Sequence, residues 1–148
     1  MVILPFFNKE KYKTIFDIIN DHALAKLGDV FANLIYSLAI SASMKHITSK
    51  KVSAAILGNA FRRSNFGKYV HVRSDLHTLA DFSEALICFS ILGDFLDVEK
   101  CKSILETKLI DIDINDRSEL NVKSINAFQF LLDHIFTLLV NVNVSLVP

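Results

Sequence analysis

The chain has 148 residues, of which 51% are hydrophobic, and its mean hydropathy is +0.37. This length fits a single domain, residues 1–148, and the high hydropathy suggests either a membrane segment or a surface shared with a second subunit. A spanning helix needs about 20 apolar residues. The run Val30–Met44 is shorter, and Ile125–Val142 is interrupted by Asp133 and His134, so we expect no membrane segment.

Charge is distributed unevenly along the chain, although the formal net charge is zero. Between Val30 and Ser74 there are seven Lys or Arg residues and no Asp or Glu, whereas the remainder carries nine basic and 16 acidic residues. Such asymmetry suggests a polyanionic partner, and an ordinary solvated basic face is the open alternative. The two cysteines lack CxxC spacing, which predicts free thiols in a reducing cytoplasm.

Proline and glycine are scarce and no strand-like alternation is sustained, which predicts an all-α chain. A basic loop is expected at residues 64–74 and an acidic loop at Asp111–Asn121. In chain order the predicted helices are Lys9–Asn20, His22–Met44 with Asp21 as N-cap, Lys50–Arg63 with Ser49 as N-cap, a helix from Ser74 or Asp75 to Leu92, Val98–Leu109, and Lys123–Val140.

The second of these helices, around HALAKLGDVFANLIYSL, is apolar on most sides and therefore predicted to be buried. One polar file interrupts it at spacings of four, three, four and three residues: His22, Lys26, Asp29, Asn33 and Tyr36. A buried carboxylate is costly unless it is paired, hydrogen-bonded or bound to a metal. Asp29 is thus either a structural acid, for example paired with Lys26, or part of a site.

A second group of acids lies on the helix that reads DLHTLADFSEALICFSIL. Asp81 and Glu84 are three residues apart and His77 is four before Asp81, so all three side chains share one side of the helix. Neighbouring carboxylates repel, and a divalent cation relieves that repulsion. Two acids from this helix and Asp29 from the other would make an oxygen-rich Mg²⁺ site; the alternative is an ordinary solvated helix face.

Two motifs in these helices resemble those of a known family. Leu27–Asp29 read LGD, and Ala80–Ile87 read ADFSEALI about fifty residues later. Their order and separation are similar to the signature motifs of the ribonuclease III endonuclease domain, over roughly residues 10–140. The resemblance implies a ribonuclease III-like helical fold that works as a homodimer. Because no double-stranded-RNA-binding domain follows, the chain is similar to the compact, Mini-III-like members.

The resemblance also implies roles for particular residues. Asp29, Asp81 and Glu84 take the places of catalytic acids that hold Mg²⁺ or Mn²⁺. Candidates just outside these ligands are Lys26, Asn33 and His77. The resemblance and the uneven charge distribution together predict that six basic residues contact RNA phosphates: Lys50, Lys51, Arg62, Arg63, Lys68 and Arg73.

The sequence departs from the family pattern one turn before the LGD aspartate. Fuller members have a glutamate there, and this chain has Ala25, followed by Lys26. The preferred interpretation is a metal-dependent endoribonuclease that hydrolyses double-stranded or structured RNA. The alternative is a non-catalytic dimeric RNA-binding protein of the same fold, and a third reading is an unrelated helical interaction module.

Overall fold

The computed structural model describes residues 2–70 and 75–148, and in this part of the chain every regular element is a helix. The elements are η1 (Lys9–Lys11), α1 (Ile15–Ile19), α2 (His22–Met44), α3 (Ala54–Arg63), α4 (Phe66–Tyr69), α5 (Leu76–Leu92), α6 (Val98–Glu106) and α7 (Arg117–Asn141). The prediction of an all-α fold is confirmed.

Aspartate side chains cap the N-termini of three of the predicted helices. Asp21 accepts hydrogen bonds from the first amides of α2, Asp75 accepts from Thr78 N at 2.8 Å, and Asp97 accepts from Lys100 N at 2.7 Å. Each carboxylate accepts hydrogen bonds from amides that have no partner within the helix. Its negative charge also interacts favourably with the positive end of the helix dipole. The predicted bounds of α2 and the start and end of α5 are therefore confirmed.

The predicted first helix, Lys9–Asn20, is wrong because the chain is extended between η1 and α1. Here the backbone pairs with the C-terminal tail: Ile15 N donates to Ser145 O at 2.9 Å, and Ser145 N donates to Lys13 O at 3.0 Å. Thr14 then starts α1 through a capping box with Asp17. A contact with a segment 130 residues away thus overrides local helical periodicity.

The predicted helix Lys50–Arg63 is correct only from Ala54 onward. Ser53, not Ser49, caps α3, because its hydroxyl accepts from Ile56 N at 3.2 Å. Residues 48–52 are extended instead and run along α2. The predicted basic loop that follows contains the short helix α4.

Helix bounds also differ near the acidic loop. α6 ends at Glu106 rather than Leu109, where the Thr107 hydroxyl donates to Ile104 O at 2.7 Å. α7 begins at Arg117, six residues before the predicted start, because Asp116 caps it by accepting from Glu119 N at 3.1 Å. The loop is therefore shorter than predicted.

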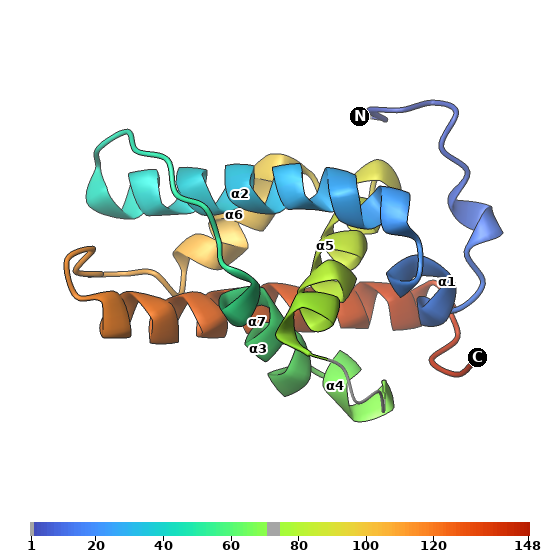
Figure 1. The fold of residues 1–148 in the computed structure, drawn as a ribbon. Coiled ribbons are helices and arrows are strands. Elements are labelled where there is room, and N and C mark those ends of the chain that lie inside the picture. Colours follow the sequence, from blue (N-terminus) through green and yellow to red (C-terminus); the bar gives the residue numbers. More distant parts are fainter. Residues whose placement is uncertain (1, 71–74) are drawn as a thin grey trace.

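α5 lies at the centre of the fold and is buried along nearly its whole length. Its most extensive contacts are with α2 and α3, and Figure 1 shows it crossing between α2 and α7, which lie on opposite sides of the domain. α2 is the one described helix long and apolar enough to cross a membrane by length and composition. Its packing against α5 and α6 gives it a place in the folded domain instead.

Two glycines let the neighbouring helices approach the backbone of α5. A Cβ atom at Gly28 of α2 would overlap the carbonyl group of Glu84, and one at Gly58 of α3 would lie 2.6 Å from Leu76 O. Between these contacts, the buried Ser83 hydroxyl donates to Leu57 O of α3 at 3.0 Å. The absence of a side chain at Gly28 therefore lets α2 approach α5 closely enough to place Glu84 beside α2. The absence of a side chain at Gly58 allows the same close approach of α3 to α5.

We expect Gly28→Ala to lower the free energy of unfolding by about 2 kcal/mol or more, despite the better helix propensity of alanine, because the methyl group meets backbone that cannot rotate away. Urea denaturation followed by circular dichroism measures the change. Ser43→Ala on the same helix is the control: the buried Ser43 hydroxyl has no hydrogen-bond partner in the described structure, so its removal is expected to be neutral or stabilising. Equal stability of Gly28→Ala and wild type would contradict the close contact.

Candidate active site

The three acids of the two motifs meet at one pocket, which we call the acid pocket. It has a volume of about 580 Å³, and Asp29 of α2 lines it together with Asp81 and Glu84 of α5. Its other charged or titratable side chains are His22, Lys26, Lys51 and His77. Residues that are 52 positions apart in the sequence, Asp29 and Asp81, are thus brought together by the crossing of α2 and α5.

The acids differ in burial, and not in the way the sequence suggested. Asp29 and Asp81 are exposed, whereas the Glu84 residue is only 7% exposed. The prediction that Asp29 is buried is wrong because α2 buries one side only and leaves Val30 and Leu34 in solvent. The costly acid is Glu84, which stands where Gly28 brings the two backbones into contact.

Burial and like charge act together on Glu84. They raise the pKa of its carboxyl from the ordinary value of 4.5 to about 8. Burial is the largest cause, followed by the negative charge of Asp29, a hydrogen bond shared with Asp29, and the negative charge of Asp81. The Glu84 carboxyl is therefore held in its protonated form at neutral pH, beside the two exposed acids of the pocket.

Asp29 is oriented by an amide rather than by an ion pair. Asn33, one turn later on α2, donates from Nδ2 to Asp29 Oδ1 at 3.3 Å. In the described residues ion pairs join Lys102 to Glu106 and Lys123 to Glu119, and none joins Lys26 to Asp29. The interpretation of Asp29 as the structural partner of Lys26 is not supported.

The predicted phosphate-contacting residues are divided between the acid pocket and the surface beyond it. Only Lys51 lines the pocket. Arg62 and Arg63 are exposed in the last turn of α3, and Lys68 is exposed on α4. Lys50 precedes Lys51 but does not line the pocket. Arg73 lies outside the described residues.

The donor set has the chemistry that Mg²⁺ prefers, because carboxylate oxygens are hard ligands. Within the described ranges no group of three or more Asp, Glu, His or Cys side chains is arranged so that it could hold a metal ion by itself. Mg²⁺ usually keeps several waters and binds through one or two carboxylates. An open acid pocket with repelling carboxylates fits such a hydrated ion, and it does not fit a tight zinc cage.

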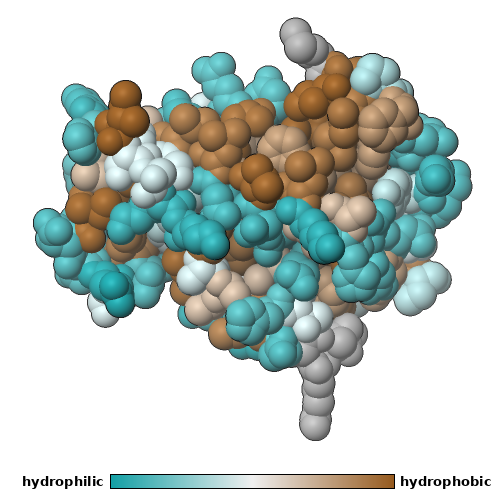
Figure 2. All heavy atoms as spheres, turned by 45° about the horizontal axis from the view of Figure 1, so that its top comes forward, coloured by the Kyte–Doolittle hydropathy of each residue, from teal (hydrophilic) through white to brown (hydrophobic). Residues whose placement is uncertain are grey.

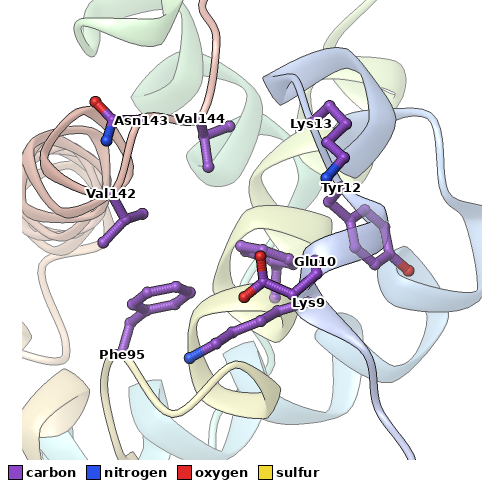
Figure 3. Close-up of a pocket in the computed structure, with 9 residues that line it drawn as sticks. Lys9, Glu10, Tyr12, Lys13, Phe95, Val142, Asn143 and Val144 are labelled. Atoms are coloured by element: carbon purple, nitrogen blue, oxygen red, sulfur yellow. The ribbon is translucent and has the colours of Figure 1, made fainter.

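A second cavity, of about 330 Å³, lies between the N-terminal segment and the C-terminal tail (Figure 3). The Lys9 ammonium that borders it donates to Gly93 O at 3.1 Å and lies 4.7 Å from the centroid of the Phe95 ring. Tyr12 turns its hydroxyl away from the cavity and donates to Asp21 at 2.7 Å. The polar groups here are used in holding the N-terminal segment, and the cavity holds no cluster of acids.

Fold and site together define an all-α protein in which two crossing helices share a carboxylate pocket. Residues 22–140 match the family model described as Ribonuclease III, and this range includes both motifs. The chain therefore belongs to the ribonuclease III family, which indicates a ribonuclease-type function with RNA as the substrate. A comparison with curated proteins finds no match.

Sequence reasoning missed the extended segment that carries Lys51 to the pocket. It is held by Asn33, Ser37 and Ser41, which are spaced one turn apart on α2. That spacing was visible in the sequence, but hydroxyl groups on a helix surface have many uses. Their partners are main-chain groups, which no residue type reveals.

The raised pKa of Glu84 predicts a pH-dependent effect of Glu84→Gln on stability in the presence of EDTA. Below pH 4.5 wild-type Glu84 is protonated in both states. Between pH 4.5 and 8 the unfolded chain ionises first, so wild type loses stability that the glutamine variant keeps. We expect the variant to gain on the order of a few kcal/mol relative to wild type by pH 8, measured by urea denaturation across this range. Asp111→Asn, at an exposed acid that does not line the pocket, is the control. A difference between Glu84→Gln and wild type that stays constant across this range would contradict the assignment.

Proposed function

We propose that this protein is a metal-dependent endoribonuclease that hydrolyses phosphodiester bonds of double-stranded or structured RNA. The observation that carries the proposal is the meeting of Asp29, Asp81 and Glu84 in one pocket next to Lys26 and Lys51. Membership of the ribonuclease III family supports the class of reaction. The carboxylates supply a cation site, and the lysines supply charge for an RNA phosphate at the same place.

In this proposal Asp29 and Glu84 hold Mg²⁺ or Mn²⁺, with Asp81 as a further ligand or an acceptor for its waters. The chemistry that the ion supplies when bound is activation of water and stabilisation of the charge that develops on the phosphate oxygens. Glu84 must give up its proton to take part, which an adjacent cation favours. Asn33 keeps the Asp29 carboxylate turned toward the pocket.

The RNA backbone would approach from the basic segment between α2 and α5. Lys51 at the pocket and the exposed Arg62, Arg63 and Lys68 provide cations for successive phosphates. Duplex RNA is recognised largely by shape and backbone rather than by base edges. Binding should therefore weaken steeply with salt and depend little on sequence.

A second candidate is a non-catalytic RNA-binding protein of the same fold. Two features favour it: Lys26 lies in the wall of the acid pocket, and Ala25 stands where fuller family members have a glutamate. An ammonium group there offsets carboxylate charge that would otherwise attract a metal ion. The two candidates share RNA binding and differ in cleavage.

The decisive experiment incubates purified protein with long duplex RNA, with Mg²⁺ or with EDTA. We expect Mg²⁺-dependent cutting, and we expect Asp81→Asn to reduce the rate at least 100-fold because it removes a carboxylate charge from the pocket. Asp111→Asn makes the same chemical change outside the pocket and should cut at the wild-type rate. Salt-sensitive binding without cutting would favour the second candidate, and neither binding nor cutting would contradict both.

We further propose that the protein is a homodimer. α2 presents an exposed apolar stripe formed by Leu27, Val30, Leu34 and Leu38, whose spacing puts all four on one side of the helix. Figure 2 shows the hydrophobic surface of the molecule in this region. Contiguous apolar patches of this kind are typical of interfaces, and a second copy could cover the stripe with its own by two-fold symmetry.

The homodimer is tested by placing charge on the stripe. We expect the double variant Val30→Lys, Leu34→Lys to be monomeric at concentrations where wild type is a dimer, measured by sedimentation equilibrium, because lysine is costly to bury between two copies. Ile47→Lys is the matched control: Ile47 is even more exposed, at 92% against 61% for Val30, but it lies in the turn after α2. A monomeric wild type, or disruption by Ile47→Lys alone, would contradict this interface.

A further inference from the structure

The extended residues 48–52, which we call the strap, are fastened to α2 by side chains of the helix. The Ser41 hydroxyl donates to Thr48 O at 2.9 Å and accepts from Thr48 N at 3.0 Å. The Ser37 hydroxyl does the same with Lys50, at 3.0 and 2.9 Å. Each serine therefore satisfies both main-chain groups of its partner, as a neighbouring strand would.

The fastening depends on a match between two periodicities. Four residues of an α-helix such as α2 span about 6 Å along its axis, and two residues of an extended chain span about 6.6 Å. Residues 33, 37 and 41 can therefore meet residues 52, 50 and 48 in antiparallel order. The left-handed conformation of Lys45, with φ of 56°, reverses the chain after α2 and makes this direction possible.

Of the three α2 residues that hold the strap, Asn33 differs from Ser37 and Ser41 because it carries an amide instead of a hydroxyl. Asn33 Oδ1 accepts from Val52 N at 2.8 Å, which fixes the orientation of the amide because Val52 N can only donate. The other arm, Nδ2, then faces Asp29 and donates to its carboxylate at 3.3 Å. Asn33 is thus bonded at once to the strap and to an acid of the pocket.

The two segments that Asn33 joins carry side chains of opposite charge in the acid pocket. On one side is the Asp29 carboxylate, and on the other is the strap, whose Lys51 and Val52 line the acid pocket. The relative placement of acid and cation is therefore set at one side chain.

We propose that Asn33 is a positioning residue that holds the Asp29 carboxylate and the Lys51-bearing strap in a fixed relation around the acid pocket. This inference rests on the proposed function, because it assigns to that relation a role in holding the cation and the RNA phosphate together. Asn33 acts through Asp29 and the strap and does not itself line the pocket.

The test compares Asn33→Leu, which keeps the shape and removes both hydrogen bonds, with Ser37→Ala, which removes two bonds of the strap and leaves Asn33 intact. The dissociation constant for Mn²⁺ is measured by electron paramagnetic resonance of the free ion, and amide hydrogen exchange follows residues 48–52. Groups that orient a metal-binding side chain typically matter by roughly 10- to 100-fold. We expect Asn33→Leu to weaken Mn²⁺ binding about tenfold and Ser37→Ala to stay within twofold, although both speed exchange in the strap.

Asn33→Ala serves as a second variant if Asn33→Leu does not fold. It has no side-chain donor for Asp29 and no acceptor for Val52 N, so Mn²⁺ binding should again weaken about tenfold. Equal weakening by Ser37→Ala, or wild-type Mn²⁺ binding in both Asn33 variants, would overturn the inference alone. A wild-type protein that binds no Mn²⁺ would overturn the proposed function and this inference with it.

Discussion

At one point of the molecule two helices touch backbone to backbone, and the arrangement of the site follows from that contact. Gly28 of α2 lies directly against the carbonyl group of Glu84 on α5. The residue after Gly28 is Asp29, so the contact fixes the distance between two carboxylates from distant parts of the chain. It also buries Glu84 and raises the pKa of its carboxyl. One missing methyl group thus couples helix packing to the electrostatics of the acid pocket.

Stability and chemistry are opposed at this contact. A buried carboxylate next to two other acids costs free energy in the absence of a cation. The remainder of α5 offsets this cost by burying an almost continuous apolar surface between α2 and α3. Its core includes Leu86, Ile87 and Phe89, all essentially inaccessible to solvent. The fold can therefore keep an unfavourable group in place at the position where a cation would make it favourable.

Much of the fold could be predicted from the sequence because its main helices are locally encoded. Asp21 and Asp75 are strong N-caps, and no proline follows them within either helix, so the sequence predicts both ends of α2 and α5 correctly. Helix spacing suggested the grouping of the three acids, and the resemblance to the family motifs supported it. Residue pattern alone gave the wrong burial for Asp29, because an apolar helix can also leave part of its apolar surface exposed.

What the sequence could not supply were contacts between main chain and distant groups. The extended chain before α1 depends on pairing with Ser145, and the late start of α3 depends on hydrogen bonds from α2 to the strap. The segments that are held carry no signal of these contacts, because the backbone of every residue type offers the same donor and acceptor. Local propensity therefore predicts the first and third helices too long, because tertiary hydrogen bonds keep the residues before α1 and α3 out of the helical conformation.

The alternation of the strap separates attachment from chemistry. Only residues 48, 50 and 52 are bonded to α2 in the described structure, and their main-chain groups make the bonds. The side chain at position 51 can therefore be changed without removing any of the hydrogen bonds that attach the strap to α2. A single substitution at Lys51 can therefore change the charge beside the acids while the strap keeps its position.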